Sequence, residues 1–315
     1  MRCLVTGVAG FIGSHLAEAL LKEGYQVTGI DCFTDYYSKE LKKVNLVNLK
    51  ESKNFKFIKA DLLDLDLPLI LKQTDWVFHL AAQAGVRASW GREFEIYTQN
   101  NVLATQKLLE ASKKVKLKGF IYASSSSVYG DTNTLPTPEE VYLQPLSPYG
   151  VTKLAGEHLC YLYHKNFGIP TVALRYFTVY GPRQRPDMAF HRFLKAALLE
   201  EKIEIYGDGK QTRDFTYISD IIDVHLMVMN HLHPGEVFNI AGGTQTSLKT
   251  ALALISEITG HKIKIIYKPQ QKGDVRHTAA DITKAKNILG YEPQVGLSDG
   301  LGAEWKWIQT IYKNY

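Results

Sequence analysis

The chain has 315 residues, of which 45% are hydrophobic and 22% charged, and its formal net charge is +5. This length suffices for about two domains or one large α/β unit, while the lack of a long apolar run and of a lysine/arginine block argues against membrane and nucleic-acid binding. Cys3, Cys32 and Cys160 are scattered and fit neither a disulfide framework nor metal-ligand spacing, so we expect free thiols in a reducing cytoplasm and no metal site.

In chain order, short β-rich runs alternate with amphipathic stretches in the first half. The predicted strands are Arg2–Thr6, Gln26–Asp31, Phe55–Ala60, Trp76–Leu80, Gly119–Ala123 and Thr171–Tyr176. The predicted helices are Ile12–Lys22, Val102–Lys114 and Tyr149–Phe167. This alternation predicts an α/β fold with a Rossmann-type, doubly wound parallel sheet, in which ligands bind at the carboxyl ends of the strands.

After Tyr176 the pattern loosens, with glycine, proline and charged residues between 181 and 212. Helical patterns return at Val224–Asn230 and Thr250–Ile258. We therefore predict a first domain of residues 1–176 plus about 214–241. Residues 177–213 and 242–315 are predicted to form a smaller C-terminal lobe.

A glycine-rich loop joins the first strand to the first helix. Gly7, Gly10 and Gly13 allow a tight turn, close approach to a pyrophosphate and close helix packing, and Phe11 and Ile12 begin the helix whose free N–H groups attract an anion. The spacing is G-x-x-G-x-x-G and differs from the commoner G-x-G-x-x-G. An ordinary glycine-rich turn is the alternative, but the position directly after an N-terminal strand favours dinucleotide binding.

Asp31 ends the second strand, about 20 residues after the glycines, where a carboxylate can accept hydrogen bonds from a ribose 2′-OH and repel a 2′-phosphate. This position favours NAD over NADP, although Asp31 could instead cap local N–H groups. The ends of the next two strands are expected to line the same site: Asp61, Leu62, Leu80, Ala81 and Ala82. The first domain is thus predicted to bind NAD.

Tyr149 and Lys153 lie one turn apart on a helix that Ser147 caps and Pro148 begins. We expect Lys153 and the positive nicotinamide ring to lower the pKa of Tyr149, so that it can exchange protons with a sugar hydroxyl. The run 124–127 is four serines at the end of a strand, where a hydroxyl can orient the tyrosine. Each pattern alone also fits a surface helix or a polar turn.

Taken together, these motifs resemble the extended short-chain dehydrogenases/reductases, and within them the nucleotide-sugar epimerases and dehydratases. The matching segments, which extend over essentially the whole chain, are Gly7/Gly10/Gly13, His79–Ala82, Ser125 with Val128–Gly130, Tyr149 with Lys153, Leu174–Pro182, Gly207–Gly209 with Arg213–Phe215, and Gly273–Arg276 with Asp281.

The resemblance implies roles for further residues. Ser125 matches the catalytic hydroxyl residue, Asn101 matches a helix asparagine that contacts the cofactor, and Arg213 and Arg276 match arginines that hold the substrate pyrophosphate. Each arginine could otherwise belong to a surface ion pair. The smaller lobe is then the substrate-binding lobe, and the resemblance implies a homodimer formed by the helices near 102–114 and 149–167.

Within the family, dehydratases carry an Asp-Glu pair and decarboxylases a Glu where this chain has Ser126 and Ser127. This departure favours epimerisation at C4. The segment 177–189 is similar to UDP-glucuronate 4-epimerases, which implies that Ser126, Ser127, Thr178 and Arg185 form a pocket for a C6 carboxylate. The alternatives are an epimerase of neutral UDP-hexoses or UDP-N-acetylhexosamines, a UDP-glucuronate decarboxylase, and an inactive NAD-binding regulator.

Overall fold

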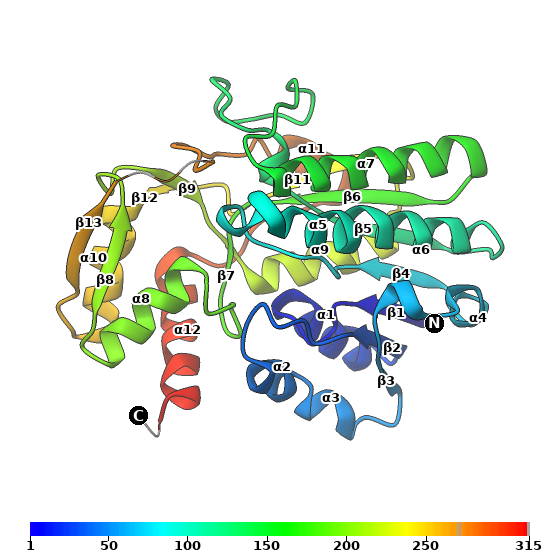
Figure 1. Ribbon diagram of the computed structural model, residues 1–315, viewed down its shortest axis with the longest axis horizontal. Coiled ribbons are helices and arrows are strands. Elements are labelled where there is room, and N and C mark those ends of the chain that lie inside the picture. Colours follow the sequence, from blue (N-terminus) through cyan, green and yellow to red (C-terminus); the bar gives the residue numbers. More distant parts are fainter. Residues whose placement is uncertain (270, 272, 314–315) are drawn as a thin grey trace.

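The computed structural model describes residues 1–269, 271 and 273–313. Its centre is a seven-stranded, entirely parallel sheet (Figure 1). In spatial order the strands are β11 (Val237–Ile240), β6 (Thr171–Tyr176), β5 (Gly119–Ser125), β4 (Trp76–His79), β1 (Arg2–Thr6), β2 (Gln26–Asp31) and β3 (Phe55–Lys59). This order confirms the predicted α/β class with a Rossmann-type doubly wound sheet.

Helices cover both faces of this sheet, because its strands bury alternate residues on opposite sides. In β1, Cys3 and Val5 join one apolar core while Leu4 joins the other, as the two-residue period of a strand requires. The first core includes residues of α1 (Phe11–Lys22), α3 (Val47–Glu51), α9 (Ile218–Asn230) and α11 (Thr283–Leu289). The second includes residues of α4 (Leu67–Leu71), α6 (Ala104–Ser112) and α7 (Pro148–Phe167).

The strand order reverses between β1 and β4. From β1 the chain moves outward to β2 and β3, then returns to β4 on the other side of β1. The connections after these two strands leave in opposite directions, which opens a crevice at the carboxyl ends of β1 and β4. The glycine loop and residues 80–82 lie at these two ends.

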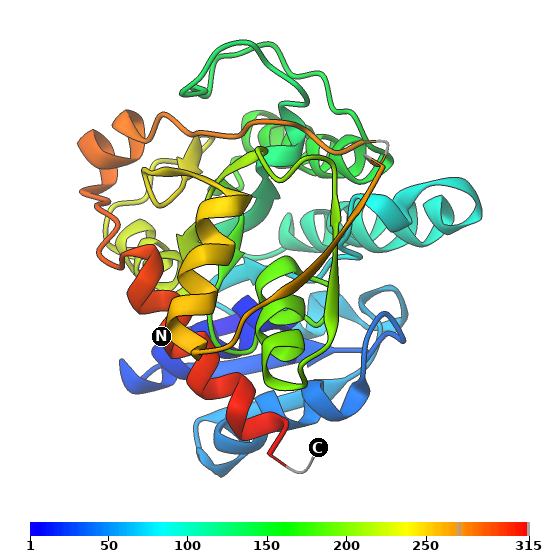
Figure 2. The same ribbon diagram turned by 90° about the vertical axis from the view of Figure 1, so that its left-hand side faces the viewer.

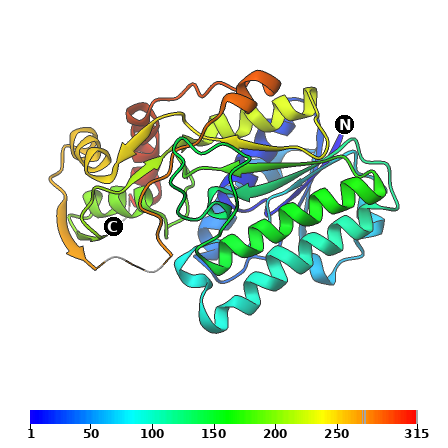
Figure 3. The same ribbon diagram turned by 90° about the horizontal axis from the view of Figure 1, so that it is seen from above.

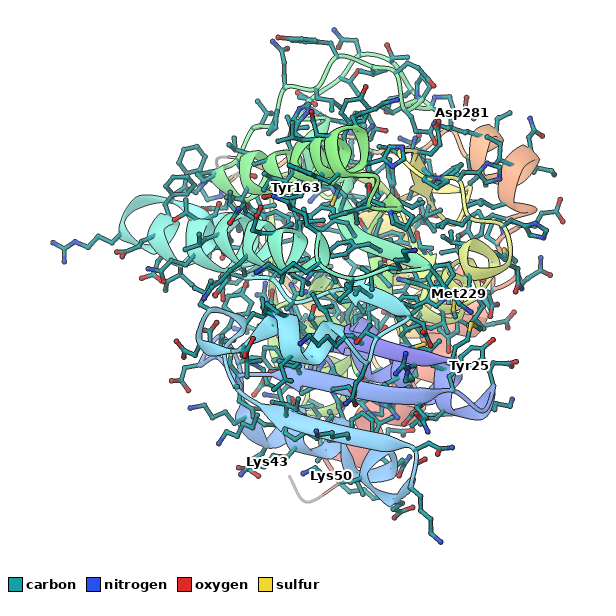
Figure 4. All side chains as sticks on the ribbon, turned by 90° about the vertical axis from the view of Figure 1, so that its right-hand side faces the viewer. Tyr25, Lys43, Lys50, Tyr163, Met229 and Asp281 are labelled. Carbon is teal, nitrogen blue, oxygen red and sulfur yellow. The ribbon has the colours of Figure 1, made fainter. Side chains whose placement is uncertain are left out.

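Helices α6 and α7 run side by side on one face of the sheet (Figure 3). Tyr163 of α7 joins them, because its hydroxyl donates to Glu110 at 2.7 Å and accepts from Gln106 at 2.9 Å (Figure 4). The predicted helix at 102–114 begins differently in the structure. A short helix α5 (Phe94–Tyr97) leads into a π-helical segment, Thr98–Leu103, and only then into α6.

A separate apolar core holds the smaller lobe together (Figure 2). It includes residues of α8 (Ala189–Leu198), α10 (Leu248–Thr259), α12 (Leu297–Ile311) and β8 (Lys202–Tyr206), and β8 pairs in parallel with β13 (Lys264–Lys268). Two further pairs complete the small sheets: β7 (Val179–Tyr180) with β10 (Thr216–Tyr217), and β9 (Thr212–Asp214) with β12 (Gln245–Ser247).

The chain returns to the large sheet after entering the smaller lobe. Strand β11 pairs with β6, and α11 buries Ala285 and Leu289 in the core that α9 also occupies. The sequence-based division places α11 in the smaller lobe, whereas its apolar side packs against the large sheet. The division into two domains otherwise remains a prediction.

Among the described residues, no helix is both long and apolar enough to span a bilayer.

Candidate active site

The glycine loop between β1 and α1 is shaped by backbone contacts that exclude side chains. Gly7 has φ +71°, and a Cβ there would lie 2.9 Å from the backbone of Ala81. A Cβ on Gly13 would lie 2.3 Å from the carbonyl oxygen of Gly7. Gly10 begins α1 without a side-chain cap, and the first turn of α1 carries no acidic residue, so its free N–H groups face the cleft unopposed. This cradle fits a pyrophosphate.

Asp31, at the end of β2, connects this loop to the next one. One carboxylate oxygen accepts the backbone N–H of Ala9 at 3.0 Å and the other that of Phe33 at 2.9 Å. Burial raises the pKa of Asp31, and these hydrogen bonds and the charge of Lys42 oppose the rise. The capping role and the ribose-reading role are therefore compatible, because each oxygen has a second lone pair that can face the cleft.

The cleft at the switch point encloses about 1190 Å³ of empty space, including solvent at its mouth. It is lined by all the predicted cofactor residues except Asn101, namely Gly7, Gly10, Phe11, Ile12, Gly13, Asp31, Asp61, Leu62, Leu80, Ala81, Ala82, Tyr149 and Lys153. Sequence reasoning missed the lining residues that follow β2: Cys32, Thr34, Tyr36 and Tyr37 of the loop, and Lys42 of the short helix 39–45. No local pattern indicated them, since the course of this loop depends on tertiary packing.

Thr6 and His79 fix the backbone at the end of β4. The Thr6 hydroxyl accepts the N–H groups of Leu80 and Ala81, both at 3.1 Å, and is hydrogen-bonded to His79 Nδ1 at 2.8 Å. His79 Nε2 is 2.9 Å from the Thr105 hydroxyl. Burial lowers the pKa of His79 to about 3, so this ring is neutral and structural. Through Thr6, His79 fixes the backbone of Leu80 and Ala81, against which Gly7 packs.

Asn101, for which the resemblance implies contact with the cofactor, does not line the cleft. Its side chain is 1% exposed, accepts the N–H of Gln83 at 2.7 Å and donates to the Gln83 carbonyl and the Thr152 hydroxyl. It therefore ties the loop after β4 to α7, and its neighbour Asn100 lines the cleft instead. The π-helical segment changes which side of the helix faces the cleft, and the spacing of motifs could not reveal this.

Tyr149 and Lys153 are positioned by the start of α7. The Ser147 hydroxyl accepts the N–H of Gly150 at 3.1 Å, and Pro148 occupies the first turn, as predicted. Lys153 Nζ donates to the Ala123 carbonyl at 2.8 Å, and burial lowers the pKa of Lys153 to about 8. The helix thus places a buried ammonium beside the end of β5.

The pKa of Tyr149 differs from the sequence-based expectation. Burial raises it, while a hydrogen bond with the Ser125 side chain and the charge of Arg185 act in the opposite direction. The expected lowering by Lys153 is wrong for the protein by itself, because desolvation of the phenolate dominates and Lys153 is engaged by Ala123.

The serine run begins at the end of β5, with Ser124 and Ser125, and continues into a 3₁₀ turn, Ser126–Val128. The Ser125 hydroxyl caps it by accepting the N–H of Ser127 at 3.1 Å, and Ser125 Oγ lies 3.2 Å from Ser127 Oγ. Ser124 points away from this turn and donates to Glu157. The cap keeps Ser125 next to Tyr149, so the two predicted catalytic hydroxyls are together.

A buried ion pair supports the serines from behind. Glu157 of α7 accepts two hydrogen bonds from Arg175 of β6, at 2.9 and 2.8 Å, and both side chains are buried. Arg175 also donates to the Tyr129 hydroxyl at 2.8 Å, which in turn donates to Asn239 of β11 at 2.7 Å. This network connects α7, β6, β11 and the turn after β5, and sequence reasoning did not detect it.

Arg213 and Arg276 line a second pocket of about 620 Å³, also open to solvent, between β8, β9 and the segment 274–276. Arg276 is exposed and pairs with Asp208 at 3.3 Å. Arg213 donates to the carbonyls of Thr212 and Arg276, and burial lowers its pKa. The structure brings the two arginines into one open pocket, and the diphosphate-binding role that the resemblance implies for them stays a prediction.

Arg185 lines the first cleft near Tyr149, and its guanidinium forms a two-pronged ion pair with Asp187, with both distances 3.0 Å. Thr178 lies between β6 and β7. It follows the carboxyl end of β6, and Ser126 and Ser127 follow the carboxyl end of the neighbouring strand β5. The structure thus has two binding regions: a cofactor-sized cleft that contains Tyr149 and Lys153, and a separate arginine pocket whose lining includes neither residue.

Comparison with known proteins agrees with this geometry. The family described as GDP-mannose 4,6 dehydratase matches residues 4–303. A Bacillus subtilis protein named "Uncharacterized UDP-glucose epimerase YtcB" is 48% identical over 99% of both chains, and a UDP-glucuronate 4-epimerase of Thermodesulfobacterium geofontis is 41% identical over 96% of this chain and 95% of its own. The crystal structure of UDP-glucuronic acid 4-epimerase from Bacillus cereus, in complex with UDP-glucuronic acid and NAD, is 50% identical over 99% of this chain and all of that one, with a TM-score of 0.97. The chain therefore belongs to the GDP-mannose 4,6-dehydratase family of short-chain dehydrogenases/reductases, in the branch that holds nucleotide-sugar 4-epimerases.

Proposed function

We propose that this chain is an NAD⁺-dependent nucleotide-sugar 4-epimerase that interconverts UDP-glucuronate and UDP-galacturonate. The observation that carries the choice of sugar is the cationic end of the cleft. Arg185 lies there near Tyr149, and Ser126 and Ser127 occupy the positions where related dehydratases and decarboxylases have acids. The similarity to the B. cereus enzyme, at 50% identity, supports the same choice.

The cleft suits NAD⁺, which supplies the hydride acceptor and a positive charge at its ring when bound. The N-terminus of α1 would hold the pyrophosphate, Asp31 the adenosine ribose, and Asp61 and Leu62 the adenine end. Lys153 would add positive charge near the catalytic phenol. Arg213 and Arg276 would hold the diphosphate of the UDP-sugar in the second pocket.

The reaction needs one proton acceptor at the sugar. The Tyr149 phenolate takes the proton of the C4 hydroxyl as hydride leaves C4, and Ser125 donates a hydrogen bond to the oxygen that becomes the carbonyl. When hydride returns to the opposite face of C4, Tyr149 gives the proton back to the same oxygen. In the protein by itself burial raises the pKa of Tyr149, against the hydrogen bond with Ser125 and the charge of Arg185. The positive ring of bound NAD⁺ would lower this pKa and favour the phenolate.

A carboxylate at C6 creates a chemical problem, because the 4-keto intermediate is a β-keto acid that tends to lose CO₂. Loss is fastest when the breaking C–C bond aligns with the carbonyl π system. Hydrogen bonds from Ser127, Thr178 and Arg185 that hold the carboxylate out of this alignment would suppress the loss. The absence of an acid at 126 and 127 removes the group that would assist elimination.

A neutral UDP-hexose is the second candidate substrate, because the 48% identical B. subtilis relative is named a UDP-glucose epimerase. A neutral hydroxymethyl group would not require Arg185 in the cleft. Incubation of the purified protein with UDP-glucuronate and NAD⁺, followed by product analysis, tests the proposal. We expect UDP-galacturonate without net NADH, with little UDP-pentose. Faster epimerisation of UDP-glucose, or mainly pentose product, would contradict it.

We also propose that the protein forms a homodimer through α6 and α7. The apolar side chains that these helices and the preceding π-helical segment expose include Leu103, Val151, Tyr161, Leu162 and Phe167, each about half exposed. An exposed apolar surface of this kind is typical of protein interfaces. Light scattering measures the mass of the wild type and of Leu162→Glu in solution. We expect a dimeric wild type and a weakened dimer in the variant, and a monomeric wild type would contradict the proposal.

A further inference from the structure

Arg185, the cationic residue of the proposed carboxylate pocket, is already paired within the protein. Its Nε and one terminal nitrogen each lie 3.0 Å from an oxygen of Asp187. The side chains are only 22% and 35% exposed. Asp187 raises the pKa of Arg185 against the effect of burial, and Arg185 lowers the pKa of Asp187, so both groups are charged at neutral pH.

Tyr36 holds Asp187 from the other side of the cleft. Its hydroxyl donates to Asp187 at 3.2 Å, and its ring lies 5.9 Å from the Arg185 guanidinium carbon. Tyr36 belongs to the loop between β2 and α2 (Lys39–Asn45), which lies beside the segment between β7 and α8 (Figure 1). Asp187 is thus fixed by two elements and is not a freely moving surface carboxylate.

The pair leaves Arg185 with further donors. A guanidinium group has five N–H donors, and Asp187 takes one from Nε and one from a terminal nitrogen. Arg185 also lines the cleft, and its charge acts on the pKa of Tyr149, so the guanidinium group lies near the reacting phenol. A substrate carboxylate would therefore meet an arginine whose charge is largely balanced.

We propose that Asp187 is a positioning and specificity-determining residue that weakens the attraction of Arg185 for the substrate carboxylate, so that the sugar can turn within the site. This inference rests on the proposed function. A 4-epimerase must present both faces of the keto sugar to the same hydride carrier, so a carboxylate held by a full, unbalanced charge would hinder turning. Arg185 instead keeps its hydrogen-bond geometry, while Asp187 reduces its charge.

The test replaces Asp187 by an isosteric neutral residue. In a Tyr149→Phe background, which removes the proton acceptor, calorimetry measures the Kd of UDP-glucuronate and of UDP-glucose with and without Asp187→Asn. We expect Asp187→Asn to lower the Kd of UDP-glucuronate roughly three- to thirtyfold, the range that one charge about 8 Å away gives for effective dielectric constants between about 60 and about 20, and to leave UDP-glucose unchanged. In the active enzyme the same substitution should lower both kcat and KM for UDP-glucuronate.

Two control variants separate charge from structure. Glu18→Gln breaks the neighbouring Arg183–Glu18 pair, which has a 2.8 Å contact and side-chain exposures of 17% and 32%, similar to those of Arg185–Asp187. Arg183 is not among the residues that line the cleft, so the ratio of the two Kd values should not change. Tyr36→Phe removes the hydrogen bond to Asp187 but keeps the charge, and should also keep this ratio.

The outcomes distinguish this inference from the proposed function. If wild-type enzyme epimerises UDP-glucuronate but Asp187→Asn raises the Kd values of both sugars in parallel, Asp187 is only a structural residue and the inference is wrong. If Asp187→Asn binds UDP-glucuronate more tightly but keeps the wild-type kcat, the inference is also wrong. Rotation of the keto sugar would then not depend on how tightly Arg185 binds the carboxylate. Failure of the wild type to act on UDP-glucuronate would instead contradict the proposed function.

Discussion

Asp31→Ala should change both cofactor affinity and cofactor choice. The ribose hydroxyls lose a charged acceptor, and hydrogen bonds to charged groups contribute about 1.5–3 kcal/mol, so the Kd of NAD⁺ should rise roughly ten- to hundredfold. NADP⁺ should be affected far less, because the substitution also removes the repulsion between the Asp31 carboxylate and a 2′-phosphate. The preference for NAD⁺ should therefore largely disappear.

The same substitution should lower the free energy of unfolding. The N–H groups of Ala9 and Phe33, at 3.0 and 2.9 Å from the carboxylate, lose their acceptor. An unsatisfied buried N–H costs about 1–3 kcal/mol. Two effects reduce this loss: water can reach the partly exposed site, and the substitution removes a carboxylate whose burial is unfavourable, as its raised pKa indicates. We expect a net loss of about 1–2 kcal/mol in urea unfolding.

Calorimetric titration with NAD⁺ and NADP⁺ measures the two affinities. Asp61→Ala is a matched control, since Asp61 lines the same cleft and accepts a single local N–H, that of Leu63 at 2.9 Å. Its loss should weaken both cofactors by the same factor, because their adenine rings are identical. Equal affinity of the wild type for NAD⁺ and NADP⁺, or an equal loss of both in Asp31→Ala, would refute the assignment of Asp31.

Three further variants test the site. Tyr149→Phe should keep substrate binding but lose at least ~10²-fold in turnover, measured by product analysis, and near-normal turnover would exclude Tyr149 as the acid/base. Ser127→Ala combined with Thr178→Ala should lower epimerisation and raise the share of UDP-pentose, and an unchanged product ratio would argue against the carboxylate pocket. Arg213→Ala should raise the KM of the UDP-sugar more than Arg276→Ala, because Arg213 is the more buried and Arg276 already pairs with exposed Asp208; the reverse order of KM values would contradict this.

The network of Glu157 and Arg175 gives Ser125, the predicted catalytic serine, a rigid support. A buried charged pair is costly unless its hydrogen bonds are complete, and here the guanidinium bonds Glu157, Tyr129 and the Glu139 carbonyl. This arrangement fixes β5, β6 and α7 relative to one another. The position of Ser125 is thereby determined by the rigid sheet and not by the loop that follows it.

The amino-acid sequence by itself determined the features that depend on near neighbours. The short β-rich runs predicted strands β1, β2 and β6 with their observed bounds, and the spacing of Gly7, Gly10 and Gly13 predicted the turn into α1. The Ser147 cap and the one-turn separation of Tyr149 and Lys153 were also predictable. These features follow from backbone geometry over a few residues, which is the same in any tertiary surrounding.

Only the tertiary structure decided which distant groups meet. Burial raises the pKa of Tyr149, Lys153 contacts Ala123, and Tyr36 meets Asp187 across 151 positions of the chain. The π-helical segment turned Asn101 inward, and the packing of α11 placed a late segment on the large sheet. Such contacts depend on how whole elements pack, and side-chain desolvation depends on everything that covers the group, so no local pattern contains them.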